Sequence, residues 1–369
     1  MITYLLWLGV LALIVTATLL LYRRPPKVDV TRTLPSSIFA NQSMELAVRV
    51  RVRASLPTRV HLEDAPPRTI VPDATVDFGG LLLGDSEHEL RVKLTANRRG
   101  VFEWQDVKLA WADPFGLKWR SVTLPVRSVV EVYPRTHGLV LPNLLRPLLS
   151  EGNLTRTIGL EDPMSLRGAR PYVPGDAPSR ISWKLSARSG ELMLRELERT
   201  ASSSLQVHLD LHGNDTYVES AVRLAASLVG EALDLGLPVS VSDASGATET
   251  GHTPEALRLA LRKLAQAKAE TGPQRVPPPK LGSNVVIITG AASDDLVREA
   301  LGARSGASRV VIVALPEGFY LEPGEKGRPI RSAPPDEIRA LERRAGVLAE
   351  SGVLVFVLRG NQSVLKLGG

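Results

Sequence analysis

The spacing of hydrophobic residues changes along this chain of 369 residues, and that change limits which folds it can adopt. From about residue 28 to 135, apolar and polar residues alternate, as in MELAVRVRVRA, which is typical of strands buried on one face. After residue 202, short and almost continuously apolar runs alternate with stretches of helical spacing, which is typical of parallel strands joined by helices. The chain therefore predicts an antiparallel β-sandwich followed by an α/β domain.

Four further alternating segments support the β-sandwich: HELRVKLTA, EWQDVKLAW, WRSVTLPV and VVEVYP. Turn-forming residues separate the strands at DAPP, FGG, NRRG and DPFG. In the second half, the predicted strands are LQVHLDL, LPVSVSD, NVVIIT, SRVVIVAL and VLVFVL. The helix TPEALRLALRKLAQAKAE begins with Thr253 as N-cap and Pro254 at its first position, where both residue types are favoured. This alternation predicts βαβ units with right-handed crossovers.

Residues 1–22 form an unbroken apolar stretch without a charged side chain. About 20 such residues are needed to cross a bilayer as a helix, and Trp7 and Tyr22 are suited to its interfaces. Arg23 and Arg24 follow the stretch, whereas no basic residue precedes it. The positive-inside rule therefore predicts a single-pass anchor in the inner (cytoplasmic) membrane, with the soluble domains in the cytoplasm. A cleaved signal peptide would need basic residues first and a cleavage site, which the stretch lacks.

The composition and the motifs that are missing exclude several classes of function. There is no cysteine, so disulfides, thiolate catalysis and zinc–thiolate sites are excluded. The formal charge of +6 is modest for this length, and arginines are spread along the chain, which disfavours a nucleic-acid partner. The chain also lacks G-x-G-x-x-G after its first parallel strand, a Walker phosphate loop, a G-x-S-x-G elbow and H-E-x-x-H, which disfavours nucleotide binding and common hydrolase mechanisms.

Polar residues gather where the predicted parallel strands end, which is where open α/β sheets bind ligands. Oxygen ligands in such loops suit hard cations such as Mg²⁺. The candidate ligands are Asp210, Asn214, Asp215, Asp243, Asp294 and Asp295. His212 also follows the first of these strands, but a lone loop histidine is more often solvated. His208, within that strand, is predicted to be a hydrogen-bonded structural residue.

The stretch RPYVPGDAPSRISWKLSAR, residues 170–188, allows two interpretations. It contains a typical turn, VPGD, and Trp183 offers a large apolar surface. In the functional interpretation, its basic residues bind an anion or an acidic group of a partner; they are Arg170, Arg180, Lys184 and Arg188. In the structural interpretation, which we favour, the stretch joins two domains, with Trp183 packed at the contact and Asp176 paired with Arg180 or Arg188.

At this stretch the sequence resembles the bacterial domain-of-unknown-function 58 family. The matching residues are Arg170, Tyr172, Pro174, Gly175, Asp176, Arg180, Ile181, Trp183, Lys184, Ala187, Arg188 and Gly190. A second patch, RRGVFEWQDVKLAWADPFGLKWR followed by VEVYPR, is also similar to the family. Together with the membrane anchor and the α/β tail, the resemblance covers nearly the whole chain. Members of the family usually have two membrane helices, whereas this sequence shows one.

The resemblance implies that the C-terminal domain is similar to a von Willebrand factor A domain, a three-layer, Rossmann-like α/β fold. Such domains often hold a divalent cation on the pattern D-x-S-x-S and a later T-D-G. Asp210 keeps the first position, but His212 and Asn214 replace the serines, and Thr289-Gly290 lacks the later carboxylate. Asp210, Asn214 and Thr289 therefore form a degenerate site, and we expect no tightly bound Mg²⁺ and no other cofactor.

The resemblance further implies a partner, because family members are often encoded beside MoxR-type AAA+ ATPases and are proposed to act with them in protein assembly or activation. We therefore predict a membrane-anchored, non-enzymatic scaffold or adaptor that binds a protein partner. It comprises a membrane anchor (1–22), a β-sandwich domain (28–136), a connector with the family signature (137–201) and a degenerate von Willebrand factor A-like domain (202–369). The alternative is a metal-dependent hydrolase or a cation-dependent binder that uses carboxylates at the strand ends.

Overall fold

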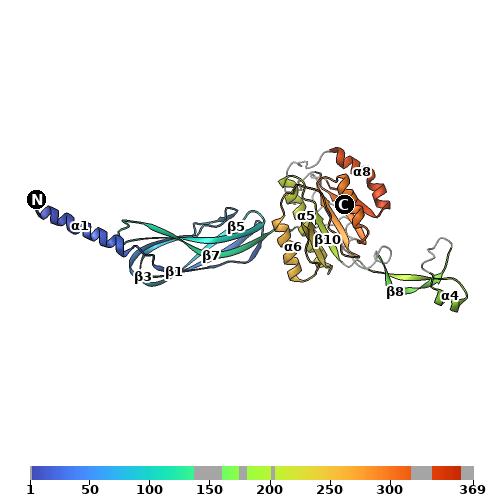
Figure 1. Ribbon diagram of the computed structural model, residues 1–369, viewed down its shortest axis with the longest axis horizontal. Helices are drawn as coiled ribbons and strands as arrows, with labels where there is room; N and C mark the ends of the chain where they lie inside the picture. The colour runs from blue at the N-terminus through green and yellow to red at the C-terminus, as the bar shows by residue number, and fades with distance from the viewer. Residues whose placement is uncertain (1, 137–159, 174–180, 201–203, 317–334, 359–369) are drawn as a thin grey trace. The chain divides into compact units, whose positions relative to one another are not determined.

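The computed structural model describes residues 2–136, 160–173, 181–200, 204–316 and 335–358. The chain divides into two compact units, Met1–Arg135 and Thr136–Gly369 (Figure 1). The first unit contains one helix and a β-sheet, and the second contains a two-stranded sheet and a larger α/β sheet. The protein is therefore a multidomain chain of mixed α and β structure.

The N-terminal helix α1 spans Ile2–Leu21 and is long and apolar enough to cross a membrane. Its 20 residues extend over about 30 Å, the thickness of the hydrocarbon core of a bilayer. None of its side chains from Thr3 onward is buried. A core helix would be largely covered by protein, so α1 has the properties of the predicted membrane span.

The rest of the first unit is a seven-stranded sheet. Its strands are β1 (Lys27–Thr33), β2 (Ser37–Phe39), β3 (Ser43–Glu63), β4 (Ile70–Pro72), β5 (Asp77–Ala96), β6 (Gly100–Ala112) and β7 (Arg120–Tyr133). They are hydrogen-bonded in the order β2-β7-β6-β3-β5-β4, and β1 also pairs with β3. Among the strand pairs described in this sheet, β2 and β7 are parallel and the others are antiparallel.

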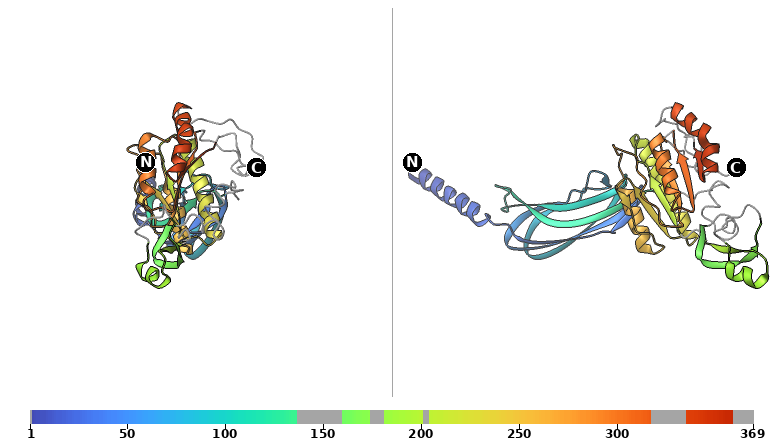
Figure 2. Two further views of the ribbon diagram at one scale, coloured as in Figure 1. Left: turned by 90° about the vertical axis from the view of Figure 1, so that its right-hand side faces the viewer. Right: turned by 45° about the vertical axis from the view of Figure 1, so that its right-hand side comes forward.

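The long strands β3 and β5 change direction midway. The first half of β3 pairs with β1, whereas its last residues pair with β6. The register between β3 and β5 shifts between Ala54 and Thr58, and the facing Gly84 has a left-handed φ of 80°. The strands curve at the end of the sheet nearest α1 (Figure 2). Residues from both halves of β3, such as Val50 and Leu62, belong to one buried cluster, so the two halves enclose a common core.

Burial alternates along most of β3, where Leu46, Val48 and Val50 are buried between more exposed neighbours, and this confirms the predicted period of two. Two details of the sequence prediction are wrong. WRSVTLPV and VVEVYP belong to one strand, β7, rather than two. FGG is part of β5 rather than a turn. A side chain on Gly79 would come within 3.3 Å of the His61 ring, so the glycine permits close pairing of β5 with β3.

In the second unit, β8 (Leu160–Pro171) and β9 (Met193–Thr200) pair as an antiparallel hairpin. The short helix α4 (Trp183–Ser189) lies between them in sequence and ends at Gly190, whose φ of 78° suits a helix C-cap. The Ser186 hydroxyl in α4 accepts a hydrogen bond from the backbone N–H of Met193 at 2.8 Å. The chain at Trp183 is therefore helical, and the chain after Leu192 is extended.

The larger sheet has six strands. They are β10 (Leu205–Leu209), β11 (Val239–Asp243), β12 (Gly246–Ala247), β13 (Asn284–Thr289), β14 (Arg309–Ala314) and β15 (Val353–Val357). Their order is β12-β11-β10-β13-β14-β15, and every neighbouring pair is parallel except β11 and β12. The chain passes from β10 to β11 on one side and then returns to β13 on the other side of β10. Open α/β sheets form a ligand crevice where the winding reverses in this way.

The described residues between these strands form four helices: α5 (Asp215–Asp234), α6 (Pro254–Gln266), α7 (Asp294–Ala303) and α8 (Pro335–Glu350). α7 and α8 share an apolar cluster with β13 and β14, through residues such as Leu296, Leu341 and Ile287. No described residue of α5 belongs to that cluster, and α5 contacts β10, β11 and β13. Since successive side chains of a strand point to opposite faces, α5 covers the other face of the sheet. Thr253 caps α6, as predicted.

Candidate binding site at the carboxyl edge of the sheet

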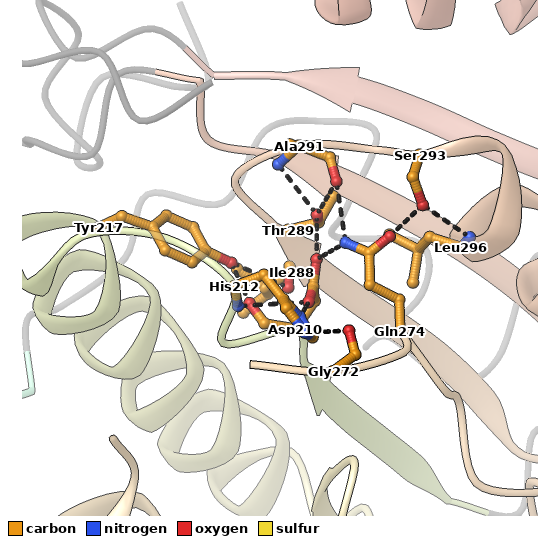
Figure 3. Close-up of polar contacts among 10 residues, drawn as sticks. All are labelled: Asp210, His212, Tyr217, Gly272, Gln274, Ile288, Thr289, Ala291, Ser293 and Leu296. Atoms are coloured by element: carbon orange, nitrogen blue, oxygen red, sulfur yellow. Dashed lines mark hydrogen bonds and ion pairs between the residues drawn. The ribbon is translucent and has the colours of Figure 1, made fainter. Parts of the chain in front are cut away.

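The polar residues that end β10 and β13 lie together, as expected at one edge of a parallel sheet. Asp210 follows β10, and Thr289 is the last residue of β13. Their side chains are hydrogen-bonded to each other (Figure 3). Gln274, from the connector between α6 and β13, also binds Asp210. The structure thus brings together two of the three residues of the predicted degenerate site.

Both carboxylate oxygens of Asp210 are occupied by donors from the same chain. Oδ2 accepts hydrogen bonds from the Thr289 hydroxyl and the Gln274 amide, each at 2.6 Å. Oδ1 lies 2.5 Å from Nδ1 of His212. The Asp210 side chain is only 2% exposed, so these bonds replace those that water would otherwise make. Burying a carboxylate in this way is tolerable only when its oxygens are satisfied.

His212 lies between two hydrogen-bond acceptors. Its Nδ1 faces the Asp210 carboxylate at 2.5 Å, and its Nε2 faces the backbone carbonyl oxygen of Gly272 at 2.9 Å (Figure 3). These two contacts tie the end of β10 to the connector at Gly272.

Tyr217 holds the two strand ends from the side of α5. Its hydroxyl donates to the backbone oxygen of Asp210 and lies 3.3 Å from that of Ile288, and its side chain is fully buried. A side chain at Gly213 would come within 2.5 Å of the Tyr217 ring, so only glycine fits there. Asn214 is the N-cap of α5, and its Oδ1 accepts the Tyr217 N–H at 2.8 Å. The amide oxygen predicted as a ligand is thus used to begin the helix.

The residues present do not fit a divalent cation of the kind that the family resemblance suggests. The Asp210 oxygens already accept three side-chain hydrogen bonds, and the Thr289 hydroxyl proton points at one of them. A cation would have to displace the histidine or the amide before it reached the carboxylate. Within the described ranges, no group of three or more histidine and carboxylate side chains is arranged to hold a metal ion.

A second polar group lies inside the sheet beside this edge. His208 in β10 is 1% exposed, and its Nδ1 is 3.1 Å from the Ser242 hydroxyl of β11, which confirms the predicted structural role. Burial is the main cause that lowers the pKa of His208 to about 4, with Lys263 acting in the same direction and Asp243 opposing it. The ring is therefore neutral at physiological pH.

The pKa values of Asp243 and Glu270 are shifted in opposite directions. The Asp243 carboxylate pairs with Lys263 at 2.8 Å. Although burial opposes ionisation, hydrogen bonds from Lys263 and Ser245 hold the pKa of Asp243 below its usual range. Glu270, just after α6, has one buried oxygen without a hydrogen-bond partner. Burial and the nearby Asp243 carboxylate raise the pKa of Glu270.

The other acidic residues predicted as ligands do not join this site in the described structure. Asp215 is in the first turn of α5, where a negative charge favours the helix N-terminus. Asp294 pairs with Arg344, and Asp295 pairs with Arg298 at 3.0 Å. The sequence also missed residues that do join it, namely Gln274, Ser293 and Tyr217. Ser293 donates to the Gln274 side-chain oxygen.

The structure describes part of the family signature. Arg170 and Tyr172 lie at the end of β8, where the Tyr172 N–H donates to the backbone oxygen of Leu192 at 2.8 Å. Lys184 and Arg188 are exposed on α4. Gly175, Asp176 and Arg180 lie outside the described residues, and so does the predicted pairing of Asp176.

The predicted packing of Trp183 at a contact between two domains stays a prediction. Trp183 is the first residue of α4, and its side chain is 69% exposed. None of the seven residues of α4 is buried, so the helix offers no pocket for the indole. Within the hairpin and α4, the apolar surface of Trp183 is therefore uncovered.

The chain thus combines a candidate membrane span, a β unit and an α/β unit with a polar site at the edge of its sheet. Residues 168–315 match the family described as "Protein of unknown function DUF58". The "Uncharacterized protein YeaD" of Bacillus subtilis (strain 168) is 28% identical over 232 residues, which cover 59% of this chain and 57% of the relative. The chain thus spans little more than half the length of that relative.

Solved structures resemble parts of the chain only distantly. PapD-like domain 7 of human CEP192 is 13% identical, with a TM-score of 0.23, over 30% of this chain and 90% of that domain. The CARDB domain of the PF1109 protein from Pyrococcus furiosus is 13% identical, with a TM-score of 0.21, over 29% of this chain and 94% of that domain. These scores are too low to support any conclusion about this protein.

Proposed function

We propose that this protein is a membrane-anchored, non-enzymatic scaffold that binds a protein partner through its second unit. In this proposal α1 is a single-pass anchor in the cytoplasmic membrane, the first unit is a β-sandwich, and the α/β unit is von Willebrand factor A-like. The bend of β3 around one core supports the sandwich. The sheet order, with its antiparallel edge strand β12, supports the A-like fold.

One observation carries the proposal: the exposed Trp183 on an ordered segment of the family signature. Large aromatic side chains are frequent at the centres of protein interfaces, where they contribute much of the binding free energy. Val173 and Leu192, at the ends of the hairpin strands, are also exposed. Lys184 and Arg188 supply positive charge on the same helix. An apolar centre with a basic rim suits a partner surface that is apolar with acidic edges.

The edge site supports a binding role rather than catalysis. Hydrolysis needs a nucleophile or metal-bound water, a base and an oxyanion site that meet in one cleft. Asp210 is instead buried and hydrogen-bonded to His212, Gln274 and Thr289. A metal-dependent hydrolase or cation-dependent binder, the alternative function, would have to break these bonds before the carboxylate could act.

The partner class proposed from the family resemblance is a MoxR-type AAA+ ATPase. The test is direct binding between the full-length protein in lipid nanodiscs and a purified MoxR-type ATPase of the same source, with ATP and with ADP. Trp183→Ala should raise the Kd about tenfold or more, which corresponds to a loss of about 1.4 kcal/mol or more in binding free energy. Because Trp183 is exposed, its substitution should leave thermal stability unchanged.

Val347→Ala is the matched control, since Val347 is 67% exposed on α8 and lies outside the hairpin. It should bind as the parent does. If the Trp183 variant binds as tightly as the parent, the hairpin is not part of the interface. Absence of binding in every nucleotide state would refute the proposed partner class. Binding that is lost on adding EDTA without nucleotide would favour the cation-dependent alternative.

A further inference from the structure

The turn between β6 and β7, with the sequence DPFGLKW, presents large apolar side chains to solvent. Phe115 is 81% exposed and Leu117 is 60% exposed, and Trp119 is also exposed. Exposed apolar groups that cluster in this way are uncommon on soluble proteins and usually mark a surface that contacts something else. The conformation of the turn is fixed by hydrogen bonds to Asp113.

Hydrogen bonds within the turn satisfy its backbone donors. The buried Asp113 carboxylate accepts the N–H groups of Phe115 at 2.9 Å, Leu117 at 3.3 Å and Lys118 at 3.2 Å. The Asp113 backbone oxygen accepts the N–H of Gly116 at 2.9 Å. Although burial opposes ionisation, these backbone donors hold the pKa of Asp113 below its usual range.

The backbone of Pro114 is also satisfied. Pro114 has no N–H, and its carbonyl oxygen accepts a hydrogen bond from Arg59 at 2.7 Å. Unsatisfied backbone groups are the main cost of moving a loop out of water into a bilayer. Because the N–H groups of residues 115–118 are already paired, the turn avoids that part of the cost and can place its apolar side chains at a membrane surface.

The turn lies level with the end of α1. Trp111, just before it, donates its indole N–H to the backbone oxygen of Tyr22 at 3.0 Å. Arg120, just after it, donates to the backbone oxygen of Leu19 at 3.0 Å. The Tyr22 hydroxyl in turn donates to the backbone oxygen of Pro57 at 2.8 Å. Both sides of the turn therefore hold the last turn of the helix, where a membrane span reaches the bilayer surface.

Neighbouring parts of the sheet add to the same apolar end. Leu56 is at the bend of β3, and Leu81 and Leu83 are near the bend of β5; all three are exposed. Leu81 and Trp119 line one open pocket of about 480 Å³ together with Arg59. The apolar surface thus extends from the turn to the two bends and is continuous with the end of α1.

Positive charge surrounds this surface. Arg23 and Arg24 follow α1 directly, Lys118 is within the turn, and all three are exposed. Aromatic side chains favour the headgroup region of a bilayer, and basic residues beside a membrane span are attracted to anionic lipids. The combination of apolar tips and cations matches a bilayer surface that contains anionic headgroups.

We infer that this end of the β unit, formed by the turn 113–119 and the bends at Leu56 and Leu83, inserts its side chains into the headgroup region of an anionic bilayer. The inference rests on the proposed anchoring by α1. The β unit is then seated on the membrane by two attachments, the span and the apolar turn.

The test uses the full-length chain in vesicles of phosphatidylcholine and phosphatidylglycerol. Since the chain has no cysteine, single nitroxide labels can be placed through Phe115→Cys, Leu11→Cys and Val71→Cys. Leu11 is in the middle of α1 and reports whether the helix spans the bilayer. Val71 is an exposed apolar residue opposite Thr95, about 35 Å along β5 from its bend at about 3.3 Å per residue.

The measurement is the collision rate of each label with oxygen, which partitions into lipid, and with a nickel chelate, which stays in water. The Phe115 label should resemble the Leu11 label in favouring oxygen, at a shallower depth, and the Val71 label should favour the chelate. Without phosphatidylglycerol, the Phe115 label should become shallower. A lipid-exposed Leu11 label with a water-exposed Phe115 label would refute the turn insertion alone. A water-exposed Leu11 label would refute the anchoring itself.

Two further outcomes would change the occupant assigned to this surface. Dipolar broadening of the Phe115 label that disappears on dilution with unlabelled protein would place a second copy of the chain on this surface. An unchanged depth without phosphatidylglycerol would overturn the assignment to anionic headgroups.

Discussion

Acidification from pH 7 to pH 4 should destabilise the α/β unit through His208. This ring is buried in the central strand β10 with a pKa of about 4, whereas a histidine in an unfolded chain has a pKa of about 6.5. Between these values the unfolded chain binds a proton that the folded chain does not bind. The free energy of unfolding therefore falls as the pH drops below about 6.5, and the loss levels off below about pH 4.

The expected magnitude follows from the two pKa values. At about 1.4 kcal/mol for each pH unit, the contribution of His208 to the free energy of unfolding decreases by roughly 3 kcal/mol between pH 7 and pH 4. Glu270, whose pKa is raised in the folded protein, acts in the opposite direction over part of this range. A variant that lacks the titrating ring is therefore needed to isolate His208.

The assay is hydrogen exchange with mass spectrometry of peptides that cover β10 and α5, in increasing urea at several pH values. Fluorescence is unsuitable, because all five tryptophans of the chain precede residue 204. His208→Gln should remove most of the decrease between pH 7 and pH 4. His252→Gln replaces an exposed histidine of the same unit and should keep the decrease. If the parent and the His208 variant lose the same stability between pH 7 and pH 4, the buried neutral ring is not the cause of that loss.

Two other substitutions test contacts within each unit. Asp64→Asn should cost about 3–5 kcal/mol in the free energy of unfolding of the β unit, because it leaves the buried Arg32 guanidinium without the carboxylate that binds it at 2.7 Å. The fluorescence of Trp104, whose ring lies 4.2 Å from that guanidinium, reports the change, and a loss below 1 kcal/mol would contradict the reasoning. Thr253→Ala should cost about 1 kcal/mol by removing the cap of α6, whereas Thr253→Ser should retain it; hydrogen exchange in the first turn of α6 distinguishes them.

The sequence predicted the α/β unit well because periodicity and end signals agree there. NVVIIT and SRVVIVAL correspond closely to β13 and β14, and Thr253-Pro254 marks the start of α6. In the β unit, alternation identified the strands but not their extent. β3 and β5 continue through a bend in place of a conventional turn, and no local residue pattern separates a strand that bends from two strands joined by a turn.

The candidate site was predicted only in part, because one of its members comes from a segment without periodicity. Asp210 and Thr289 follow from the strand ends, since parallel strands place those ends together. Gln274 lies in the proline-rich connector TGPQRVPPPKLG, which the sequence marks only as a link between elements. Its contact with Asp210 depends on the path of that connector across the carboxyl edge, and spacing along the chain does not encode that path.

Counting carboxylates at strand ends identifies acidic residues but not whether they are free to bind a ligand. Asp64, Asp113 and Asp210 are buried, and each has its oxygens occupied by donors of the chain: the Arg32 guanidinium, the backbone N–H groups of the 113–119 turn, and the Thr289, Gln274 and His212 side chains. Burial makes such pairing necessary, because an ionised carboxylate without donors is costly away from water. Glu270 shows the opposite case within the described residues, since one of its oxygens lacks a donor and its pKa is raised. The capacity of an acidic residue in this fold to bind a ligand therefore depends on the donors around it, and the aspartate that best matches a cation pattern in sequence already has its donors within the protein.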